Sequence, residues 1–157
     1  MRPGTGPLML VCSSGGHLLQ MLELREAWDP FDRVWVTFDK SDARSLLGGE
    51  RVVHAHGPTN RSVPNLLRNL RLAERVLRAE RPSAILTTGA GVAVPFAWLG
   101  RAHGIPTVYV ESLTRIDGLS LSARMIAPVA TRLYAQWPEL AESPAGRIRY
   151  AGNLFAD

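Results

Sequence analysis

Short apolar runs alternate with longer amphipathic stretches along almost the whole chain. Seven of the runs have the length and composition of β-strands: 8–12, 33–38, 51–54, 84–87, 106–110, 131–135 and 148–151. The stretches with helical periodicity are 17–28, 40–47, 62–80, 91–102 and 119–127. Strands that alternate with helices usually pair in parallel, with helices on both faces of the sheet. The pattern therefore predicts an α/β fold with a doubly wound, parallel, Rossmann-like sheet.

The length of 157 residues suits one unit of this kind, and we expect residues 1–157 to form a single domain. Cys12 is the only cysteine, which excludes an intrachain disulfide and fits a reducing compartment. The sequence shows no signal peptide, no apolar run near the roughly 20 residues that span a bilayer, and no cluster of acids suited to a divalent ion. We therefore expect a cytoplasmic protein without a metal, whose contact with any membrane is peripheral.

The net charge of +4 comes almost entirely from arginine. One face of the helical stretch 62–80 carries Arg68, Arg71, Arg75 and Arg78. The opposite face carries Leu66, Leu70, Ala73 and Leu77. The arginine face is either a solvated outer surface or a surface that attracts anionic lipid headgroups or phosphates. Nucleic acid is not an expected partner, because no aromatic side chains accompany the charge.

The first strand ends in two hydroxyls, two glycines and a histidine: Ser13, Ser14, Gly15, Gly16 and His17. Glycines let the backbone approach an anion closely, and the N–H groups that open the next helix attract negative charge. This turn therefore predicts a phosphate site, with His17 as a hydrogen-bond donor or a base. The alternative is a tight turn in which the histidine serves only as an early cap.

A second glycine turn, Gly89-Ala90-Gly91, follows the strand 84–87 and opens another helix. It also resembles the start of a dinucleotide fingerprint, since Glu111 follows about 20 residues later as that motif requires. Two features speak against the dinucleotide motif. Val94 stands at its third glycine position, and the turn does not follow the first strand of the chain.

A third loop places Glu111 and Arg115 after the strand 106–110. The two side chains form either a structural ion pair or part of a site, in which Glu111 accepts a proton or a sugar hydroxyl and Arg115 binds a phosphate. In a parallel sheet all three loops open at the same edge. Together they predict a ligand that carries both phosphate and hydroxyl groups.

Five segments resemble a known family in order and spacing: VCSSGGHLLQMLEL, TTGAGVAVP, YVESLTRIDGLSLSAR, YAQWPEL and the closing YAGN. They resemble bacterial polysaccharide-biosynthesis proteins of the PssD type. These are similar to the fourteenth protein of the eukaryotic asparagine-linked glycosylation series, which anchors a two-subunit N-acetylglucosaminyltransferase. The GGH turn is also similar to the N-terminal half of the peptidoglycan enzyme that glycosylates lipid I.

The resemblance implies the N-terminal, acceptor-side half of a GT-B glycosyltransferase, active only with a donor-binding glycosyltransferase subunit on a separate chain. The implied acceptor is a polyprenyl-diphosphate-linked sugar at the inner face of the cell membrane. Two departures from the eukaryotic pattern are a missing N-terminal membrane helix and the turn Thr88-Gly89-Ala90-Gly91 in place of Asn-Gly-Pro-Gly. The candidates for membrane docking are the arginine face and Phe96 with Trp98, for which burial against the sheet is the alternative.

These considerations predict how the site works. The acceptor diphosphate lies against Ser13, Ser14, Gly15, Gly16, Gly89, Ala90, Gly91 and Arg115. His17 is the first choice for the base that takes the acceptor's hydroxyl proton, and Glu111 is the second. No metal or other cofactor is expected. Two alternatives remain: an NAD-dependent oxidoreductase that uses Gly89, Gly91 and Glu111, or a purely structural partner of a glycosyltransferase.

Overall fold

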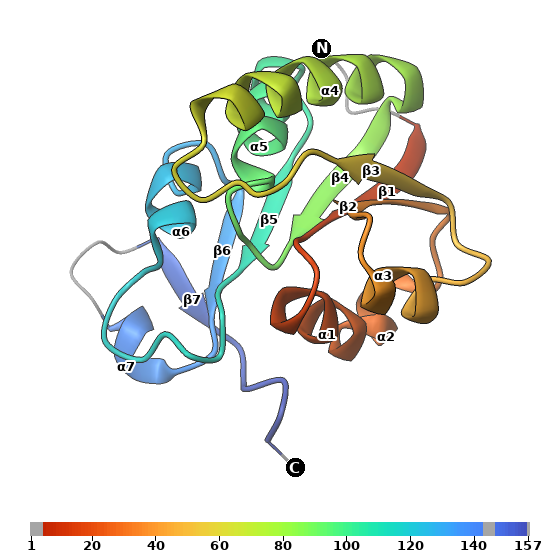
Figure 1. Cartoon of the computed structure of the whole chain (residues 1–157). Helices are drawn as coiled ribbons and strands as arrows, with labels where there is room; N and C mark the ends of the chain where they lie inside the picture. Colours follow the sequence, from red (N-terminus) through yellow and green to blue (C-terminus); the bar gives the residue numbers. More distant parts are fainter. Residues whose placement is uncertain (1–4, 143–146, 157) are drawn as a thin grey trace.

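The computed structural model describes residues 5–142 and 147–156. Within these ranges seven parallel strands form one sheet in the order β3-β2-β1-β4-β5-β6-β7 (Figure 1). The strands are β1 Gly6–Val11, β2 Arg33–Phe38, β3 Val52–Ala55, β4 Pro82–Thr87, β5 Thr107–Val110, β6 Arg132–Ala135 and β7 Ile148–Tyr150. The helices are α1 Gly16–Glu23, α2 Arg25–Trp28, α3 Ser41–Leu46, α4 Val63–Glu80, α5 Ala93–Ala102, α6 Leu121–Ile126 and α7 Pro138–Ala141.

Helices cover both faces of the sheet, which confirms the predicted doubly wound fold. Helices α4, α5 and α6 lie on one side and α1, α2 and α3 on the other (Figure 1). The alternation along β1 shows how the sequence builds these layers. Met9 and Val11 pack toward α4 and α5, whereas Leu10 and Cys12 pack toward α1. All four side chains are fully buried, and burial of a side chain as large as Leu or Met contributes about 1.5–3 kcal/mol.

The predicted helix 17–28 is interrupted at Leu24, where α1 ends and α2 begins. Trp28 supplies the physical reason. Its indole N–H donates to the backbone carbonyl of Met21 (2.8 Å), and its ring meets Trp35 edge to face with centroids 5.4 Å apart. In a continuous helix the Met21 carbonyl would accept from the Arg25 N–H; here it accepts from the Leu24 N–H (3.2 Å) and from the Trp28 indole, so this tertiary contact accompanies the break in the helix.

Helix α4 exposes all four predicted arginines, Arg68, Arg71, Arg75 and Arg78. Its buried face differs from the prediction, because Asn65 and Asn69 are buried while Leu66 is exposed and Leu70 only half-buried. The Asn69 amide explains the shift: it accepts from the His56 N–H and donates to the His56 carbonyl, both at 2.9 Å. A leucine at position 69 would have no hydrogen-bonding group to offer the His56 backbone.

None of the helices in the described ranges combines the length and the apolar composition that crossing a membrane requires.

Candidate functional site

The first two glycine turns meet where β1 and β4 lie side by side at the centre of the sheet. The Thr88 hydroxyl donates to the His17 carbonyl (2.7 Å), and the Nδ1 atom of His17 lies 2.8 Å from the Thr88 carbonyl oxygen. A ligand site at this edge is the usual arrangement in doubly wound sheets, because the helices on either side of this point cover opposite faces. The structure thus brings the two predicted turns into direct contact.

The contact with Thr88 sets the protonation of the His17 ring. A carbonyl oxygen only accepts hydrogen bonds, so Nδ1 of His17 must carry the proton. In the neutral ring, Nε2 then holds a free lone pair. His17 lines two adjoining clefts, so this basic nitrogen belongs to a site that both clefts share.

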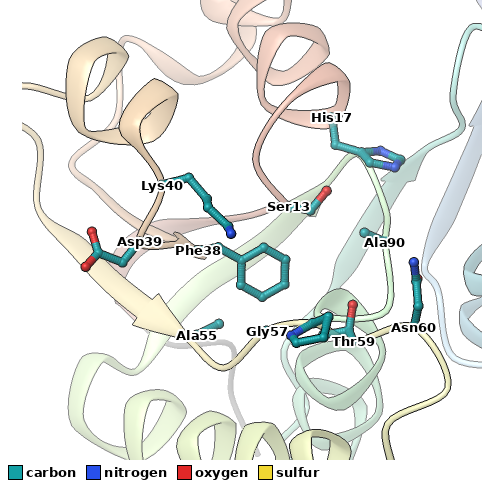
Figure 2. A pocket seen from close by; sticks show the side chains of 11 residues that line it. Ser13, His17, Phe38, Asp39, Lys40, Ala55, Gly57, Thr59, Asn60 and Ala90 are labelled. Carbon is teal, nitrogen blue, oxygen red and sulfur yellow. The ribbon is translucent and has the colours of Figure 1, made fainter.

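The first cleft, which we call the Phe38 cleft, has a volume of about 740 Å³ (Figure 2). Its wall combines one aromatic ring with hydroxyl, amide and ammonium groups. The residues that give it this character are Ser13, His17, Phe38, Lys40, Thr59 and Asn60. Figure 2 shows the Lys40 ammonium directed toward the Phe38 ring and the Asp39 carboxylate directed away from it.

The second cleft, which we call the Arg115 cleft, has a volume of about 820 Å³ and a different character. Its polar part is formed by Arg61, Ser112, Thr114, Arg115, Ser120 and Ser122. Its apolar part is formed by Val63, Leu66, Val94, Leu121 and Met125. Among the described residues that line it there is no carboxylate, so the cleft combines two cationic groups with apolar side chains.

Glu111 lies beneath this cleft and is fully buried. Its carboxylate accepts from the Ser112 N–H (2.8 Å), the Ser120 N–H (2.8 Å) and the Ser120 hydroxyl (3.1 Å). The Tyr109 hydroxyl lies 3.4 Å away, and burial together with the Glu111 charge raises the pKa of Tyr109 to about 12. Tyr109 is therefore protonated at neutral pH. Glu111 ties together both ends of the loop 112–120.

Of the two alternatives for Glu111 and Arg115, the structural ion pair does not form within the described part of the chain. Arg115 instead lines the cleft that bears its name and is exposed. The buried Gln20 side chain helps to hold the loop, because its amide donates to the Glu111 carbonyl (2.9 Å) and accepts from the Leu113 N–H (3.2 Å). The Trp137 indole donates to the Leu113 carbonyl at 2.7 Å.

The first glycine turn already holds an anion, since the Gly15 N–H donates to the Asp42 carboxylate at 2.7 Å. This contact shows that the turn can bind a negatively charged oxygen. It also means that one N–H of the predicted phosphate site is occupied by the chain itself. Ser13 faces the Phe38 cleft rather than the Arg115 cleft.

The second glycine turn is shaped by the Tyr109 hydroxyl beneath it. Gly89 has a φ of +108°, and a Cβ atom there would lie 2.4 Å from that hydroxyl. Its N–H donates to the Thr87 hydroxyl at 3.0 Å, while Ala90 and Gly91 border the Arg115 cleft. The turn follows β4, not β1, and the Glu111 carboxylate that would bind a ribose in the NAD alternative is covered by its own donors. The structure does not bring together the parts of that alternative site.

The sequence motifs missed the end of β2 and the loops that follow β2 and β3. These segments supply Phe38, Lys40, Thr59, Asn60 and Arg61 to the clefts. The loop 56–62 is held in place by α4, because Asn69 bonds the His56 backbone and the Asn65 amide donates to the Pro58 carbonyl (2.8 Å). One signal was available: both loops follow predicted strands and therefore open at the same edge of the sheet.

A model of the family described as "Oligosaccharide biosynthesis protein Alg14 like" matches residues 49–154. The UDP-N-acetylglucosamine transferase subunit ALG14 of Eremothecium gossypii is 30% identical over 96% of this chain and 82% of that protein. The corresponding subunits of Candida albicans and Mus musculus are 26% and 27% identical, each over 94% of this chain and over 78% and 82% of their own lengths.

Solved structures with the same fold include MurG of Acinetobacter baumannii, with a TM-score of 0.73 and 17% identity over 92% of this chain and 45% of MurG. S. aureus MnaA, solved with UDP, has a TM-score of 0.71 and 13% identity over 94% of this chain and 44% of that chain. The chain thus spans less than half of each of these two proteins, and at such identities the likeness concerns the fold. The family model covers more than half of the chain and the curated relatives align along nearly all of it, so the protein belongs to the Alg14-like family of oligosaccharide biosynthesis proteins, as its motifs predict.

Proposed function

We propose that the chain is the acceptor-binding, membrane-associated subunit of a two-chain glycosyltransferase of surface polysaccharide synthesis. It presents a polyprenyl-diphosphate-linked sugar at the inner face of the cell membrane, and a partner chain binds the nucleotide sugar. The relatives support the division of labour, because they are named as transferase subunits. The observation that carries the proposal is the position of His17, which lines both the cationic, apolar-walled Arg115 cleft and the polar Phe38 cleft while its Nδ1 is held by the Thr88 carbonyl.

The acceptor's diphosphate occupies the Arg115 cleft. Arg61 and Arg115 supply two guanidinium groups, which bind phosphate oxygens in pairs of parallel hydrogen bonds. Ala90 and Gly91 add backbone N–H groups at the edge of the same cleft. Of the other predicted diphosphate ligands, Gly89 shapes the turn behind this edge. The turn from Ser13 to Gly16 directly precedes His17 and reaches the Phe38 cleft through Ser13. In this turn the Gly15 N–H already binds the Asp42 carboxylate.

His17 acts as the general base. The acceptor hydroxyl gives its proton to Nε2 as its oxygen bonds to the donor's anomeric carbon, while the bond from that carbon to the departing nucleotide diphosphate breaks. The Thr88 carbonyl holds the ring and stabilises the imidazolium that results. Glu111 is fully covered, so we assign it the task of positioning the loop 112–120 and with it Arg115.

The lipid part of the acceptor leaves the cleft along an exposed apolar rim. The large apolar side chains on this rim that face solvent are Val63, Leu121 and Met125, which line the cleft, and Trp98, which contacts Met125. Trp98 is 48% exposed, and its indole donates to the Met125 carbonyl and so joins α5 to α6. Phe96 is fully buried, so it does not dock on a membrane. The arginine face of α4 continues from this rim and suits an anionic bilayer surface.

For the test, the chain is produced with an affinity tag in its own host and purified together with the nucleotide-sugar-binding protein that co-purifies with it. Transfer from UDP-N-acetylglucosamine and other nucleotide sugars to a short-chain prenyl-diphosphate sugar is measured with each protein alone and with both. We expect turnover only with both. The His17→Gln variant should lower kcat by about 10²–10⁴-fold and remove the rise of kcat with pH that a base produces.

Arg115→Gln should raise KM for the lipid-linked acceptor and leave KM for the nucleotide sugar unchanged. Arg132→Gln, an exposed arginine on β6 outside both clefts, is the matched control and should change neither constant. Wild-type turnover by the His17→Gln complex would refute the catalytic role and favour a purely structural subunit. Brisk turnover by the purified chain without a partner would refute the two-chain proposal.

A further inference from the structure

The Phe38 cleft and the Arg115 cleft differ in charge although they share a wall. The shared residues are His17, Thr59, Asn60 and Ala90. The Arg115 cleft contributes two guanidinium groups and no carboxylate from the described residues, whereas the Phe38 cleft is lined by one ammonium, from Lys40, and one carboxylate, from Asp39, which pairs with Arg44. A diphosphate therefore favours the Arg115 cleft, which leaves the Phe38 cleft to a part of the ligand that has less charge and more hydroxyls.

The Phe38 ring is the main apolar surface in its cleft. It is fixed from behind, because a Cβ atom at Gly57 would lie only 3.2 Å from two of the ring carbons. Lys40, Ser13 and Asn60 bring an ammonium, a hydroxyl and an amide around this ring (Figure 2). Polar groups that converge around an apolar surface in a cavity of roughly 300–1,000 Å³ are typical of small-ligand sites.

Sugar rings fit this combination in chemical terms. One face of a hexose presents C–H groups that pack on an aromatic ring, and its rim presents hydroxyls that hydrogen-bond to amide, hydroxyl and ammonium groups. A sugar linked to a diphosphate in the Arg115 cleft would have to pass the shared wall. A hydroxyl of the ring would then lie beside Nε2 of His17.

We propose that the Phe38 cleft is the subsite for the acceptor's sugar ring, with Phe38 as its apolar platform and Lys40 and Asn60 as its polar contacts. These three residues then determine which lipid-linked sugar is accepted. The inference rests on the proposed function, because it takes the Arg115 cleft as the diphosphate site.

The test compares the binding of two kinds of probe to the full chain by isothermal titration calorimetry. The first probe is geranyl diphosphate, and the second is a set of geranyl-diphosphate-linked sugars with one N-acetylated, one neutral and one acidic hexose. We expect at least one of the sugars to bind about tenfold more tightly than geranyl diphosphate, a gain of the size that one or two added hydrogen bonds provide.

The variants Phe38→Ala, Lys40→Met and Asn60→Ala should each remove most of this gain. Phe38→Ala and Lys40→Met, which lie outside the Arg115 cleft, should change the Kd of geranyl diphosphate less than twofold. Phe31→Ala is the matched control, because Phe31 is an exposed phenylalanine outside both clefts. Thermal melting checks that each variant is folded. Lys40→Met and Asn60→Ala alter side chains at the cleft surface, so they keep the test decisive even if Phe38→Ala unfolds the protein.

The outcomes separate the two proposals. If geranyl diphosphate does not bind, or binds equally well to Arg115→Gln, the diphosphate site itself is refuted. If geranyl diphosphate binds and Arg115→Gln weakens it, but no sugar adds affinity, only the sugar subsite is refuted. In the two-chain transfer assay, Lys40→Met should raise KM for the acceptor. A rise in KM for the nucleotide sugar instead would assign the cleft to the donor and overturn the inference.

Discussion

The imidazole of His17 is held on one side only, and this asymmetry can be observed directly. Because the Thr88 carbonyl accepts from Nδ1, the neutral ring should be the Nδ1–H tautomer with Nε2 unprotonated. Nitrogen-15 NMR of the histidine-labelled chain above pH 7.5 distinguishes the two tautomers, and the exposed His54 supplies a reference signal. A proton on Nε2 would contradict the orientation on which the role of a base depends.

Gly89 is a second residue whose role follows from one distance. Its φ of +108° and the Tyr109 hydroxyl 2.4 Å from a Cβ position both oppose a side chain. We expect Gly89→Ala to lower the free energy of unfolding by about 1–3 kcal/mol. In a Tyr109→Phe background the same substitution should lower the free energy of unfolding by less, because the Tyr109 hydroxyl, the atom nearest to the new Cβ, is absent. Gly16→Ala is the control, since its Cβ would meet no atom within 4 Å. Equal losses in both backgrounds, measured by urea unfolding, would rule out the steric explanation.

At the scale of elements, both ends of the loop 112–120 are held by one side chain. Glu111 accepts the Ser112 and Ser120 N–H groups at 2.8 Å each, and it is fully buried. Glu111→Gln replaces one carboxylate oxygen with an NH₂ group, which would face the N–H donors of Ser112 or Ser120 instead of accepting from them. We therefore expect the free energy of unfolding to fall by about 2–3 kcal/mol. The loop should also become sensitive to proteases. A Glu111→Gln variant that kept wild-type stability but lost turnover would instead make Glu111 a catalytic residue.

Strand β2 carries a cluster whose stability should vary with pH. Arg33 donates to Glu50 through Nε (3.0 Å) and Nη2 (2.7 Å), and these bonds hold the pKa of Glu50 below its ordinary value of 4.5. A lowered folded-state pKa means that the contribution is complete above pH 4.5 and is lost as the pH falls through the folded value. Glu50→Gln should therefore lower the free energy of unfolding by about 1–3 kcal/mol at pH 7.

The difference in stability between wild type and Glu50→Gln should shrink steadily below pH 4.5 in denaturant titrations. Glu26→Gln, at an exposed position on α2, should show no comparable dependence. A difference that stayed constant down to pH 3 would exclude the ion pair with Arg33 as its cause.

The sequence predicted the sheet well because strand signals are local. The run 33–38 coincides with β2, and the other six strands were placed within two residues at each end. The errors have tertiary causes. Trp28 breaks the first helix to reach Trp35, and Asn69 is buried on α4 because it bonds the His56 backbone. Neither contact is visible in a local hydrophobic pattern.

The candidate site, too, has one part that local sequence motifs predict and another part that only the folded chain shows. Glycine turns and the residues after β1, β4 and β5 carry recognisable motifs, and parallel topology alone predicts that they share an edge. Lys40 and Asn60 carry no motif, so only the folded chain shows that they border the cleft of His17. Asp42 reaches Gly15 from a different helix, a contact that spacing along the sequence cannot predict.

Over the molecule as a whole, α4, α5 and α6 cover one side of the sheet (Figure 1). These helices carry the arginine face, most of the apolar rim and several residues that line the Arg115 cleft, among them Leu66, Val94 and Met125. Leu121 is 73% exposed and Val63 is 65% exposed, and both line the cleft from which the lipid of an acceptor would emerge. Apolar side chains next to a cationic surface are what a peripheral protein presents to an anionic bilayer. The same side of the molecule would then bind the membrane and the lipid-linked acceptor.

This arrangement predicts that membrane affinity depends on where arginines lie and not only on their number. Removing Arg68, Arg71 and Arg75 together by substitution with Gln should weaken binding to vesicles rich in phosphatidylserine about 10²-fold, since each arginine near an anionic surface contributes about 1 kcal/mol. The control substitutes Gln for Arg132, Arg147 and Arg149, which are exposed on or beside β6 and β7. It therefore removes the same amount of positive charge from another surface. Sedimentation with vesicles at low and high salt measures both, and wild-type binding should fall as salt screens the charges. Equal losses in the two triple variants would mean that net charge alone attracts the protein to the vesicles, and the face of α4 would then be an ordinary solvated surface.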